Sequence, residues 1–110
     1  MSKQIKQFYE FGPYCIDTVN RRLTRNGEVV PLKAKVVETL LLLLEHDGEV
    51  LEKDDLMRRL WPDSFVEEAN LTVNISALRK ALGDTSDGQE FIQTVPKHGY
   101  RFIATVRELP

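Results

Sequence analysis

Positively charged side chains gather at two places in the C-terminal third of the chain. Arg79 and Lys80 follow a run of small residues. Further along, Lys97 and His98 lie within a Pro-Lys-His-Gly sequence, and Arg101 follows its glycine by two positions. Cationic side chains contact phosphate oxygens, and small neighbouring side chains let a helix approach a nucleic acid closely. The two groups therefore favour binding to a grooved polyanion, and duplex DNA has such a surface.

The first group lies in a segment, residues 70–82, that has the periodicity of an amphipathic helix. Apolar residues recur at helical spacing along one face, at Leu71, Ile75, Leu78 and Leu82. A rotation of about 100° per residue places a small, polar face on the opposite side. The residues expected on this accessible face are Thr72, Val73, Ser76, Ala77 and Lys80. So flat a face can lie in a major groove.

The second group lies between two runs that read as strands, within residues 91–103. The Pro-Lys-His-Gly sequence between them is typical of a turn, so the segment is predicted to be a β-hairpin. A hairpin with a basic tip can reach the phosphates or the minor groove beside a helix that occupies the major groove.

The elements that must position these two segments are read from the rest of the pattern. Short strands are predicted at 8–11, 14–19, 22–24 and 28–30, with a hairpin turn at Asn26-Gly27. Helices are predicted from about 34 to 46 and from about 53 to 60, separated by a short extended piece. The first helix is apolar on more than one side, which favours a central place in the core. The expected class is α+β.

The composition fits one domain with one core: 110 residues, 42% hydrophobic and 29% charged. The net charge of −2 is unusual for a DNA-binding domain, but the acidic residues concentrate in 45–55 and 63–68, away from the cationic segments. No apolar run approaches the roughly 20 residues of a membrane span. The single cysteine, Cys15, excludes an intrachain disulfide and favours a reducing compartment, so a cytoplasmic location is expected.

Catalytic and metal-binding patterns have little support. His46, His98 and Cys15 are too far apart in the chain to show a metal-ligand spacing. The sequence contains neither a Ser-His-Asp grouping nor a glycine-rich phosphate loop. We therefore expect no enzyme, no metal and no cofactor.

Several short motifs, in one order, resemble a known family. They are Asn26-Gly27, Leu32, Leu60-Trp61, Val73-Asn74-Ile75, Leu78 to Gly83, Ile92 to Val95 and Gly99 to Phe102. With these motifs the chain resembles the OmpR/PhoB-type DNA-binding domain of bacterial transcriptional regulators. The resemblance implies a winged helix-turn-helix with an N-terminal four-stranded antiparallel sheet, three helices and a C-terminal hairpin wing. It places the domain at residues 8–106, after a flexible N-terminus at 1–7.

The resemblance also implies a function, namely sequence-specific binding to double-stranded DNA in transcription regulation and signal transduction. Members place the third helix in the major groove and the wing at the minor groove. They usually bind direct-repeat half-sites as head-to-tail pairs. Because the sequence has no long apolar heptad or leucine stripe that could form a stable dimer seam, we expect a monomer in solution that pairs on DNA. The residues implied as DNA contacts are Asn70, Thr72, Val73, Ser76, Ala77, Arg79 and Lys80 on the helix, and Lys97, His98 and Arg101 on the wing.

In this family the loop between the second and third helices can touch RNA polymerase. Here that loop is residues 62–69, and the candidate contacts are Asp63, Phe65, Glu67 and Glu68. An equally supported alternative is that Phe65 packs beneath the loop while the acidic residues cap the next helix.

The chain departs from the response-regulator pattern at two sites. Ser76 and Ala77 stand where many members carry two arginines, so a guanine-reading pair is absent, although Val73 and Ala77 can meet thymine methyl groups. Pro96 replaces a wing arginine, with Lys97 one position later, as in the CadC/ToxR-like branch. We expect a stand-alone regulator or an excised effector domain, with any sensor or membrane part outside this chain.

The competing interpretation is a winged-helix module that binds proteins and has lost DNA contact. The Ser76-Ala77 face and the acidic isoelectric point favour it, whereas the basic residues Arg79, Lys80, Lys97 and Arg101 favour DNA. Salt-dependent binding to DNA would separate the two, because phosphate neutralisation releases counterions.

Overall fold

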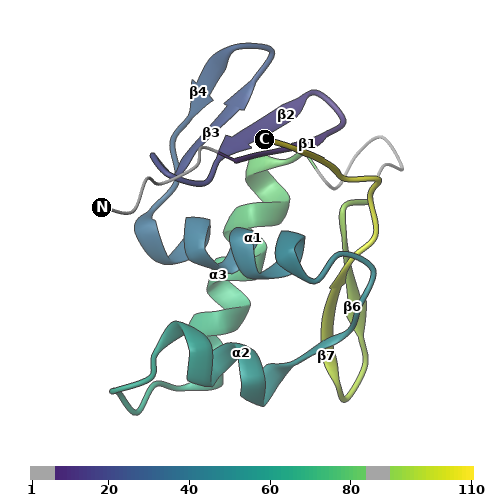
Figure 1. Ribbon diagram of the computed structural model, residues 1–110. Helices are drawn as coiled ribbons and strands as arrows, with labels where there is room; N and C mark the ends of the chain where they lie inside the picture. The colour runs from purple at the N-terminus through teal and green to yellow at the C-terminus, as the bar shows by residue number, and fades with distance from the viewer. Residues whose placement is uncertain (1–6, 84–89) are drawn as a thin grey trace.

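The structure is a computed structural model that describes residues 7–83 and 90–110 (Figure 1). Its elements are β1 (Phe8–Phe11), β2 (Tyr14–Asp17), β3 (Arg22–Arg25), β4 (Glu28–Val30), α1 (Ala34–Glu45), β5 (Leu51–Glu52), α2 (Lys53–Leu60), α3 (Glu68–Ala81), β6 (Ile92–Val95), β7 (Gly99–Phe102) and β8 (Arg107–Leu109). The predicted α+β class and the winged helix-turn-helix arrangement are confirmed. Among the described residues, no helix has the length and apolar content needed to cross a membrane.

The larger sheet contains the four predicted N-terminal strands and one more. Its order is β4-β3-β2-β1-β8, and every neighbouring pair is antiparallel. Strand β8 comes from the C-terminal end of the chain and pairs Leu109 with Phe8 of β1. It lies just beyond the range 8–106 expected for the domain. The sheet thereby brings together the two ends of the described chain.

The predicted hairpin turn between β3 and β4 is present. Asn26 and Gly27 both have positive φ, at 50° and 85°. Those angles are what a two-residue primed turn needs, because its twist matches that of the flanking strands. The Asn-Gly pair therefore accounts for the return of the chain at this point.

Helix α1 forms the centre of the core, as its apolar pattern predicts. Leu40, Leu43 and Leu44 are almost completely buried, and the helix packs against both α2 and α3. Figure 1 shows the larger sheet above α1 and the C-terminal end of α3, with α2 on the far side of α1, while the β6–β7 hairpin stands beside the helices. The tip of this hairpin and the start of α3 both lie at the end opposite the larger sheet.

Aromatic side chains join the larger sheet to the base of the hairpin. The ring of Phe11 in β1 lies 5.3 Å from that of Phe102 in β7, and Tyr14 in β2 lies 5.7 Å from Phe91, both edge to face. The Tyr14 hydroxyl also donates to the carbonyl of Ala81 at the end of α3, at 3.3 Å. The sheet therefore anchors both the hairpin and α3.

The smaller sheet has the order β5-β7-β6, so the hairpin gains a third strand from the segment before α2. This pairing requires glycine at position 99. A Cβ atom there would lie 1.9 Å from the carbonyl oxygen of Leu51, far inside van der Waals contact. We name β5, β6, β7 and the hairpin tip the wing.

Candidate nucleic-acid interface

Helix α3 is held by the apolar face that its sequence pattern predicts. Leu71, Ile75, Leu78 and the capping residue Leu82 are each at most 2% exposed. The helix begins at Glu68, two residues before the predicted start, and ends at Ala81. Its inward face packs against α1 and α2, which fixes the direction of its outward face.

One polar residue on the inward face was not predicted to have a positioning role. The side chain of Asn74 is buried, and its amide nitrogen donates to the hydroxyl of Thr39 in α1 at 3.3 Å. The same hydroxyl donates to the carbonyl of Lys35 at 2.8 Å. Because a buried amide without a partner is costly, this pair favours one rotational setting of α3 against α1. The sequence did carry a signal for this role, because Asn74 is a polar residue at a position of the helical pattern that faces the core.

The outward face of α3 is accessible, with one exception. Thr72, Val73, Ser76 and Lys80 are exposed, and Val73 reaches 65% exposure. Asn70 is also exposed and donates to the carbonyl of Glu67 at 3.2 Å. The expectation that Ala77 is equally accessible is wrong in part. It is half-buried against the core, because it follows buried Asn74 by three positions and so lies at the border between the two faces.

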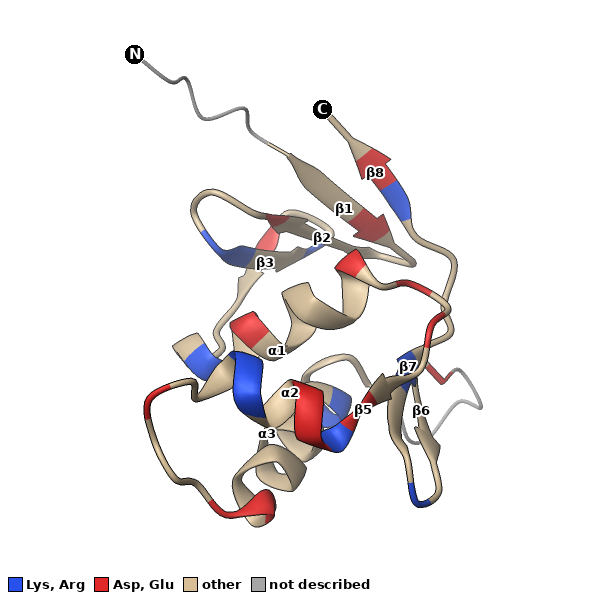
Figure 2. Ribbon diagram, turned by 60° about the horizontal axis from the view of Figure 1, so that its bottom comes forward, with Lys and Arg blue, Asp and Glu red and all other residues tan. Residues whose placement is uncertain are grey.

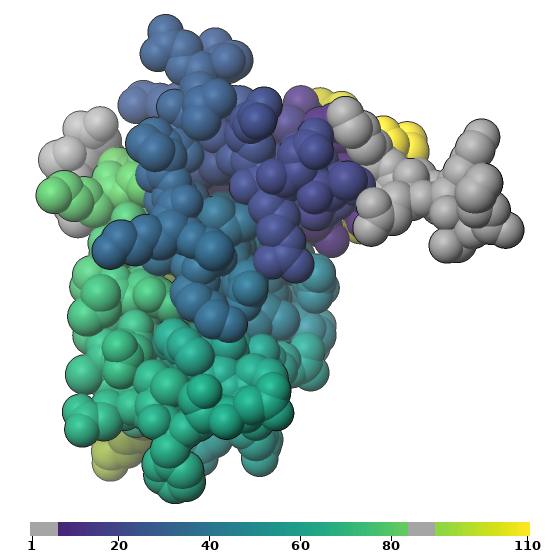
Figure 3. All heavy atoms as spheres, turned by 90° about the vertical axis from the view of Figure 1, so that its left-hand side faces the viewer, coloured from purple at the N-terminus to yellow at the C-terminus, as the bar shows by residue number. Residues whose placement is uncertain are grey.

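A shallow groove runs beside this face, between α3 and the segment that leads from β4 into α1 (Figure 3). Apolar side chains form most of its lining, including Val30, Leu32 and Val36 on one side and Val73 and Ala77 on the other. Lys33 and Lys80 also border the groove. Val73 and Ala77 therefore present their apolar surface both outward and toward this groove.

Arg79 turns away from the exposed face and toward the wing. Its Nη2 donates to the carbonyl of Ile92 at 3.0 Å and to the hydroxyl of Thr94 at 2.7 Å, both in β6. Lys80, the next residue, is exposed, and the described part of the chain offers it no hydrogen bond or ion pair. The two neighbouring cations that the sequence grouped together thus have different surroundings.

The wing tip is a tight turn with an unusual backbone. The amide of His98 donates to the carbonyl of Val95 at 3.0 Å, and Lys97 has a φ of +69°. Proline at the second position and positive φ at the third are features of a type II turn, where glycine or asparagine normally occupies the third position. Lys97 is exposed there, without a side-chain partner among the described residues.

The other two predicted wing contacts have partners within the protein. Nδ1 of His98 lies 3.2 Å from a carboxylate oxygen of Glu52 in β5. Nε of Arg101 donates to the side-chain oxygen of Gln93 across the hairpin at 2.9 Å. Sequence reasoning did not identify Glu52 or Gln93, because their contacts depend on strand pairing.

The α2–α3 loop exposes its candidate contact residues. Phe65 is fully exposed, so the alternative in which it packs beneath the loop is wrong. Asp63, Glu67 and Glu68 are exposed too, and Glu67 makes no capping bond with its side chain among the described residues. Glu68 lies in the first turn of α3 and forms an ion pair with Lys53 at 3.4 Å. Figure 2 shows acidic positions at both ends of this loop and a basic position at the tip of the hairpin.

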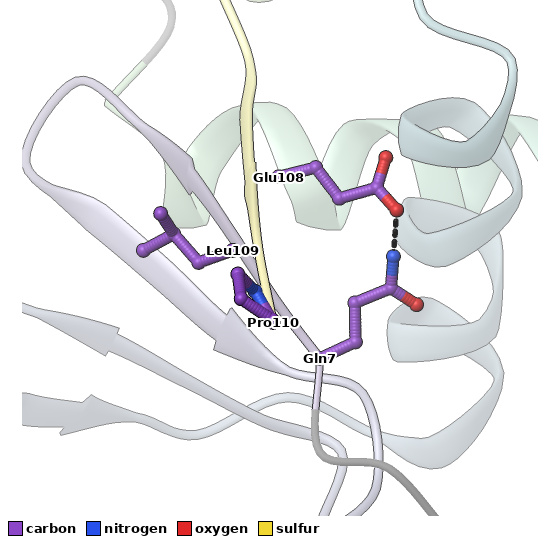
Figure 4. A pocket seen from close by; sticks show the side chains of 4 residues that line it. All are labelled: Gln7, Glu108, Leu109 and Pro110. Atoms are coloured by element: carbon purple, nitrogen blue, oxygen red, sulfur yellow. Dashed lines mark hydrogen bonds between the residues drawn. The ribbon is translucent and has the colours of Figure 1, made fainter.

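Other parts of the described chain do not assemble a chemical site. Residues 7–83 and 90–110 contain no group of three or more histidine, cysteine or acidic residues that could hold a metal ion. Burial raises the pKa of the Cys15 thiol, and the carboxylates of Glu10 and Asp17 raise it further, which disfavours a reactive thiolate. A pocket at the edge of the larger sheet is bordered by Gln7, Glu108, Leu109 and Pro110, and the Gln7 amide donates to the Glu108 carboxylate (Figure 4).

Comparison with known proteins identifies relatives of the whole fold. The family model described as "Transcriptional regulatory protein, C terminal" matches residues 27–102. The chain is 42% identical over 107 residues to the cholera toxin homolog transcriptional activator of Vibrio parahaemolyticus, covering 96% of this chain and 36% of that protein. It is 34% identical over 96 residues to the transcriptional activator CadC of Escherichia coli, covering 86% of this chain and 19% of that protein. The chain thus spans only a minor part of these relatives.

Two solved structures share the architecture. The DNA-binding domain of Escherichia coli CadC superposes with a TM-score of 0.81 at 31% identity, covering 96% of this chain and 98% of that one. The RstA DNA-binding domain of Klebsiella pneumoniae, solved in complex with the RstA box, has a TM-score of 0.74 at 32% identity, covering 87% of this chain and 96% of that one.

Proposed function

Because the chain belongs to the OmpR/PhoB-type family of transcriptional regulatory C-terminal domains, we propose that it binds specific double-stranded DNA as the effector domain of a bacterial regulator. The observation that carries this proposal is the exposed, small-residue face of α3, which the buried contacts of Leu71, Ile75 and Leu78 hold in a fixed direction. A solved relative bound to its DNA box supports the same role. The role is non-catalytic and belongs in the cytoplasm, where bacterial DNA lies.

Helix α3 would read the major groove with its small side chains. Val73 offers methyl groups to thymine, and the hydroxyls of Thr72 and Ser76 can donate to or accept from several base edges. Ala77, although half-buried, keeps the helix surface flat next to Ser76. Asn70 and Lys80, at the two ends of this face, would contact phosphates or base edges.

The wing would contact the minor groove or the adjacent backbone through its tip. Lys97 is an exposed cation held at positive φ, a conformation that costs an L-residue roughly 1–2 kcal/mol. A basic residue at a position suited to glycine supports a role for its charge. His98 and Arg101 lie behind the tip and would contribute after partly leaving Glu52 and Gln93.

Selection from a random duplex pool, followed by salt titration of the selected site, tests the proposed function. The expected result is an enriched motif whose log affinity falls linearly with log salt, with a slope of about 0.9 per phosphate neutralised. A flat salt response and no enriched motif would instead identify a winged-helix module that binds proteins.

We further propose that the domain is a monomer that pairs head to tail on direct-repeat half-sites. Among the described residues, the exposed large apolar side chains are Val29, Val50, Phe65, Val73 and Ile103, and each belongs to a different strand, helix or loop. Such a surface offers no coiled-coil seam for a stable dimer. Sedimentation is expected to give a monomer alone and two copies on a two-site duplex. A tight dimer without DNA would reject this proposal.

The α2–α3 loop is proposed to contact RNA polymerase. Phe65 is exposed between acidic neighbours, which repel phosphate while the ring offers an apolar anchor to a protein. The double variant Asp63→Ala with Glu67→Ala should keep DNA affinity and lower activated transcription. Glu45→Ala, at the end of α1, is the matched control. Equal transcription from both variants at equal DNA occupancy would leave the loop with a structural role alone.

A further inference from the structure

We propose that Arg79 is a positioning residue that fastens the wing to α3 and so fixes the spacing between the two DNA-contacting elements. The proposal rests on the DNA-binding function argued above and goes beyond it, because Arg79 was expected to contact DNA directly. In this role the Arg79 side chain does not touch DNA. It affects the specificity of DNA binding by holding strand β6 in place.

The geometry of the contact carries the proposal. A single guanidinium nitrogen, Nη2, donates to a backbone carbonyl at Ile92 and to a side-chain hydroxyl at Thr94, at 3.0 and 2.7 Å. The guanidinium is planar and always charged, so two such bonds fix orientation as well as distance. A lysine ammonium at this position would keep the charge and lose the geometry.

The hydrogen-bond pattern of the hairpin explains why an anchor at this place is effective. The amide of Ile103 donates to the carbonyl of Phe91 at 2.9 Å, which marks that opposing pair as hydrogen-bonded. Because such pairs alternate along an antiparallel ladder, the carbonyl of Ile92 points away from β7. Strand β6 is at the edge of the described sheet, and Arg79 supplies a donor to that outward carbonyl.

The consequence is that the wing tip is held at a fixed position relative to the exposed face of α3, and these two elements are proposed to enter neighbouring grooves. The exposed face of α3 and the wing tip must engage neighbouring parts of one duplex at the same time. A wing that is already held to the helix loses less conformational freedom on binding, so more of the contact energy appears as affinity for correctly spaced sites. Loosening the anchor should therefore affect specific binding more than non-specific binding.

The test uses the whole chain, the selected duplex and three variants. Arg79→Lys disrupts both bonds of the anchor and Thr94→Val removes one of them, whereas Thr94→Ser keeps the hydroxyl. We expect the first two to weaken specific binding by about fivefold to tenfold with an unchanged salt slope, and the third to match the parent. Hydroxyl-radical footprints should lose protection where the wing lies and keep it where α3 lies. Loss of protection over both parts together would overturn the proposal, because it would indicate that Arg79 and Thr94 support the whole fold and not the position of the wing.

A double-variant cycle makes the test independent of either single change. If Arg79 and Thr94 act as one anchor, Arg79→Lys with Thr94→Val should lose no more affinity than Arg79→Lys alone. Additive losses would overturn the proposal, because they indicate two separate DNA contacts. Parent-like affinity and salt slope for Arg79→Lys would overturn it too, because a phosphate contact tolerates lysine.

A measurement without DNA separates this proposal from the proposed function. Amide hydrogen exchange in β6 of the free protein should accelerate in Arg79→Lys and in Thr94→Val, but not in Lys80→Ala, which serves as the matched control. Unchanged exchange in the first two variants would reject the anchor even if the parent binds DNA well. Failure of the parent to bind DNA, with accelerated exchange in these variants, would reject the DNA-binding function and retain the anchor.

Discussion

Helix α3 and the wing both have basic residues in the sequence, but the structure makes their charges available to different degrees. On α3, Lys80 is exposed and without a partner among the described residues. On the wing, His98 lies beside Glu52 and Arg101 is bonded to Gln93, so Lys97 at the tip is the freer cation. The cations of one basic segment therefore differ in how readily their side chains can reach a ligand.

The two elements also differ in what holds them. Helix α3 rests on buried apolar side chains such as Ile75, which is 1% exposed. The wing is held by the backbone pairing of β5 with β7 inside it and by the aromatic rings around Phe102 at its base. Side-chain truncation should therefore damage the helix most, whereas a backbone clash should damage the wing most.

The largest expected effect is on the free energy of unfolding, and it distinguishes the buried face of α3 from its exposed face. Ile75→Ala should lower the free energy of unfolding by about 3 kcal/mol, because it removes a buried side chain and leaves a cavity. Val73→Ala, on the exposed face, should change it by less than about 0.5 kcal/mol. Urea denaturation measures both. A large loss of stability for Val73→Ala would show that its side chain is not a surface group.

The same pair of variants sharpens the comparison on DNA. Val73→Ala should weaken the selected site by about fivefold to tenfold and leave non-specific binding unchanged, if its methyl groups meet a base. Equal losses on specific and random duplexes would assign Val73 no part in base reading.

The second effect concerns the wing. Gly99→Ala should lower the free energy of unfolding by about 2 kcal/mol, because the added Cβ collides with the carbonyl of Leu51 and β5 must move away from β7. Hydrogen exchange should localise the damage to β5 and β7. The neighbouring exposed change His98→Ala is the control and should be nearly silent in stability. A stable Gly99→Ala variant with protected β5 amides would contradict this account.

Much of the fold was predictable because its signals are local. The apolar spacing of Leu71, Ile75 and Leu78 marked both the existence of α3 and its buried face, and Asn26-Gly27 marked the turn between β3 and β4. The start of α3 was less clear, because Glu68 and Ala69 add only about half a turn and carry no large apolar side chain that would extend the pattern. The local sequence pattern therefore predicted which helices and strands exist better than it predicted the residues at which they begin and end.

The features that sequence reasoning missed depend on residues far apart in the chain. Strand β8 has three residues and forms a strand through its pairing with β1, about a hundred positions earlier. The partners of Arg79 and His98 lie 13 to 46 positions away, at Ile92, Thr94 and Glu52. Such contacts leave no periodic signal. The direct DNA role given to each cation therefore stays a prediction.

A third prediction compares Lys80 and Lys97, which have no partner among the described residues, with Arg101, which is hydrogen-bonded to the amide of Gln93. Lys80→Ala and Lys97→Ala should each weaken binding to all duplexes and make the salt slope shallower by about one, because each removes one phosphate contact. Arg101→Ala should change the slope less, since its guanidinium is engaged with Gln93. Affinity measured at several salt concentrations decides the matter. An unchanged slope for Lys80→Ala would remove its phosphate role.

The smallest expected effect concerns the carboxylate beside the wing tip. Glu52 lies 3.2 Å from Nδ1 of His98 and adds negative charge next to the surface proposed to meet phosphate. Exposed charge pairs contribute at most about 1 kcal/mol, so Glu52→Gln should tighten DNA binding by roughly threefold. The gain should shrink at high salt, because screening weakens the repulsion that the substitution removes. Glu45→Gln is the control, since Glu45 lies near Tyr9 of the larger sheet and should leave affinity unchanged. If Glu52→Gln weakens DNA binding instead, the carboxylate of Glu52 holds His98 in an orientation that favours binding. The contact between Glu52 and His98 would then support DNA contact and not limit it.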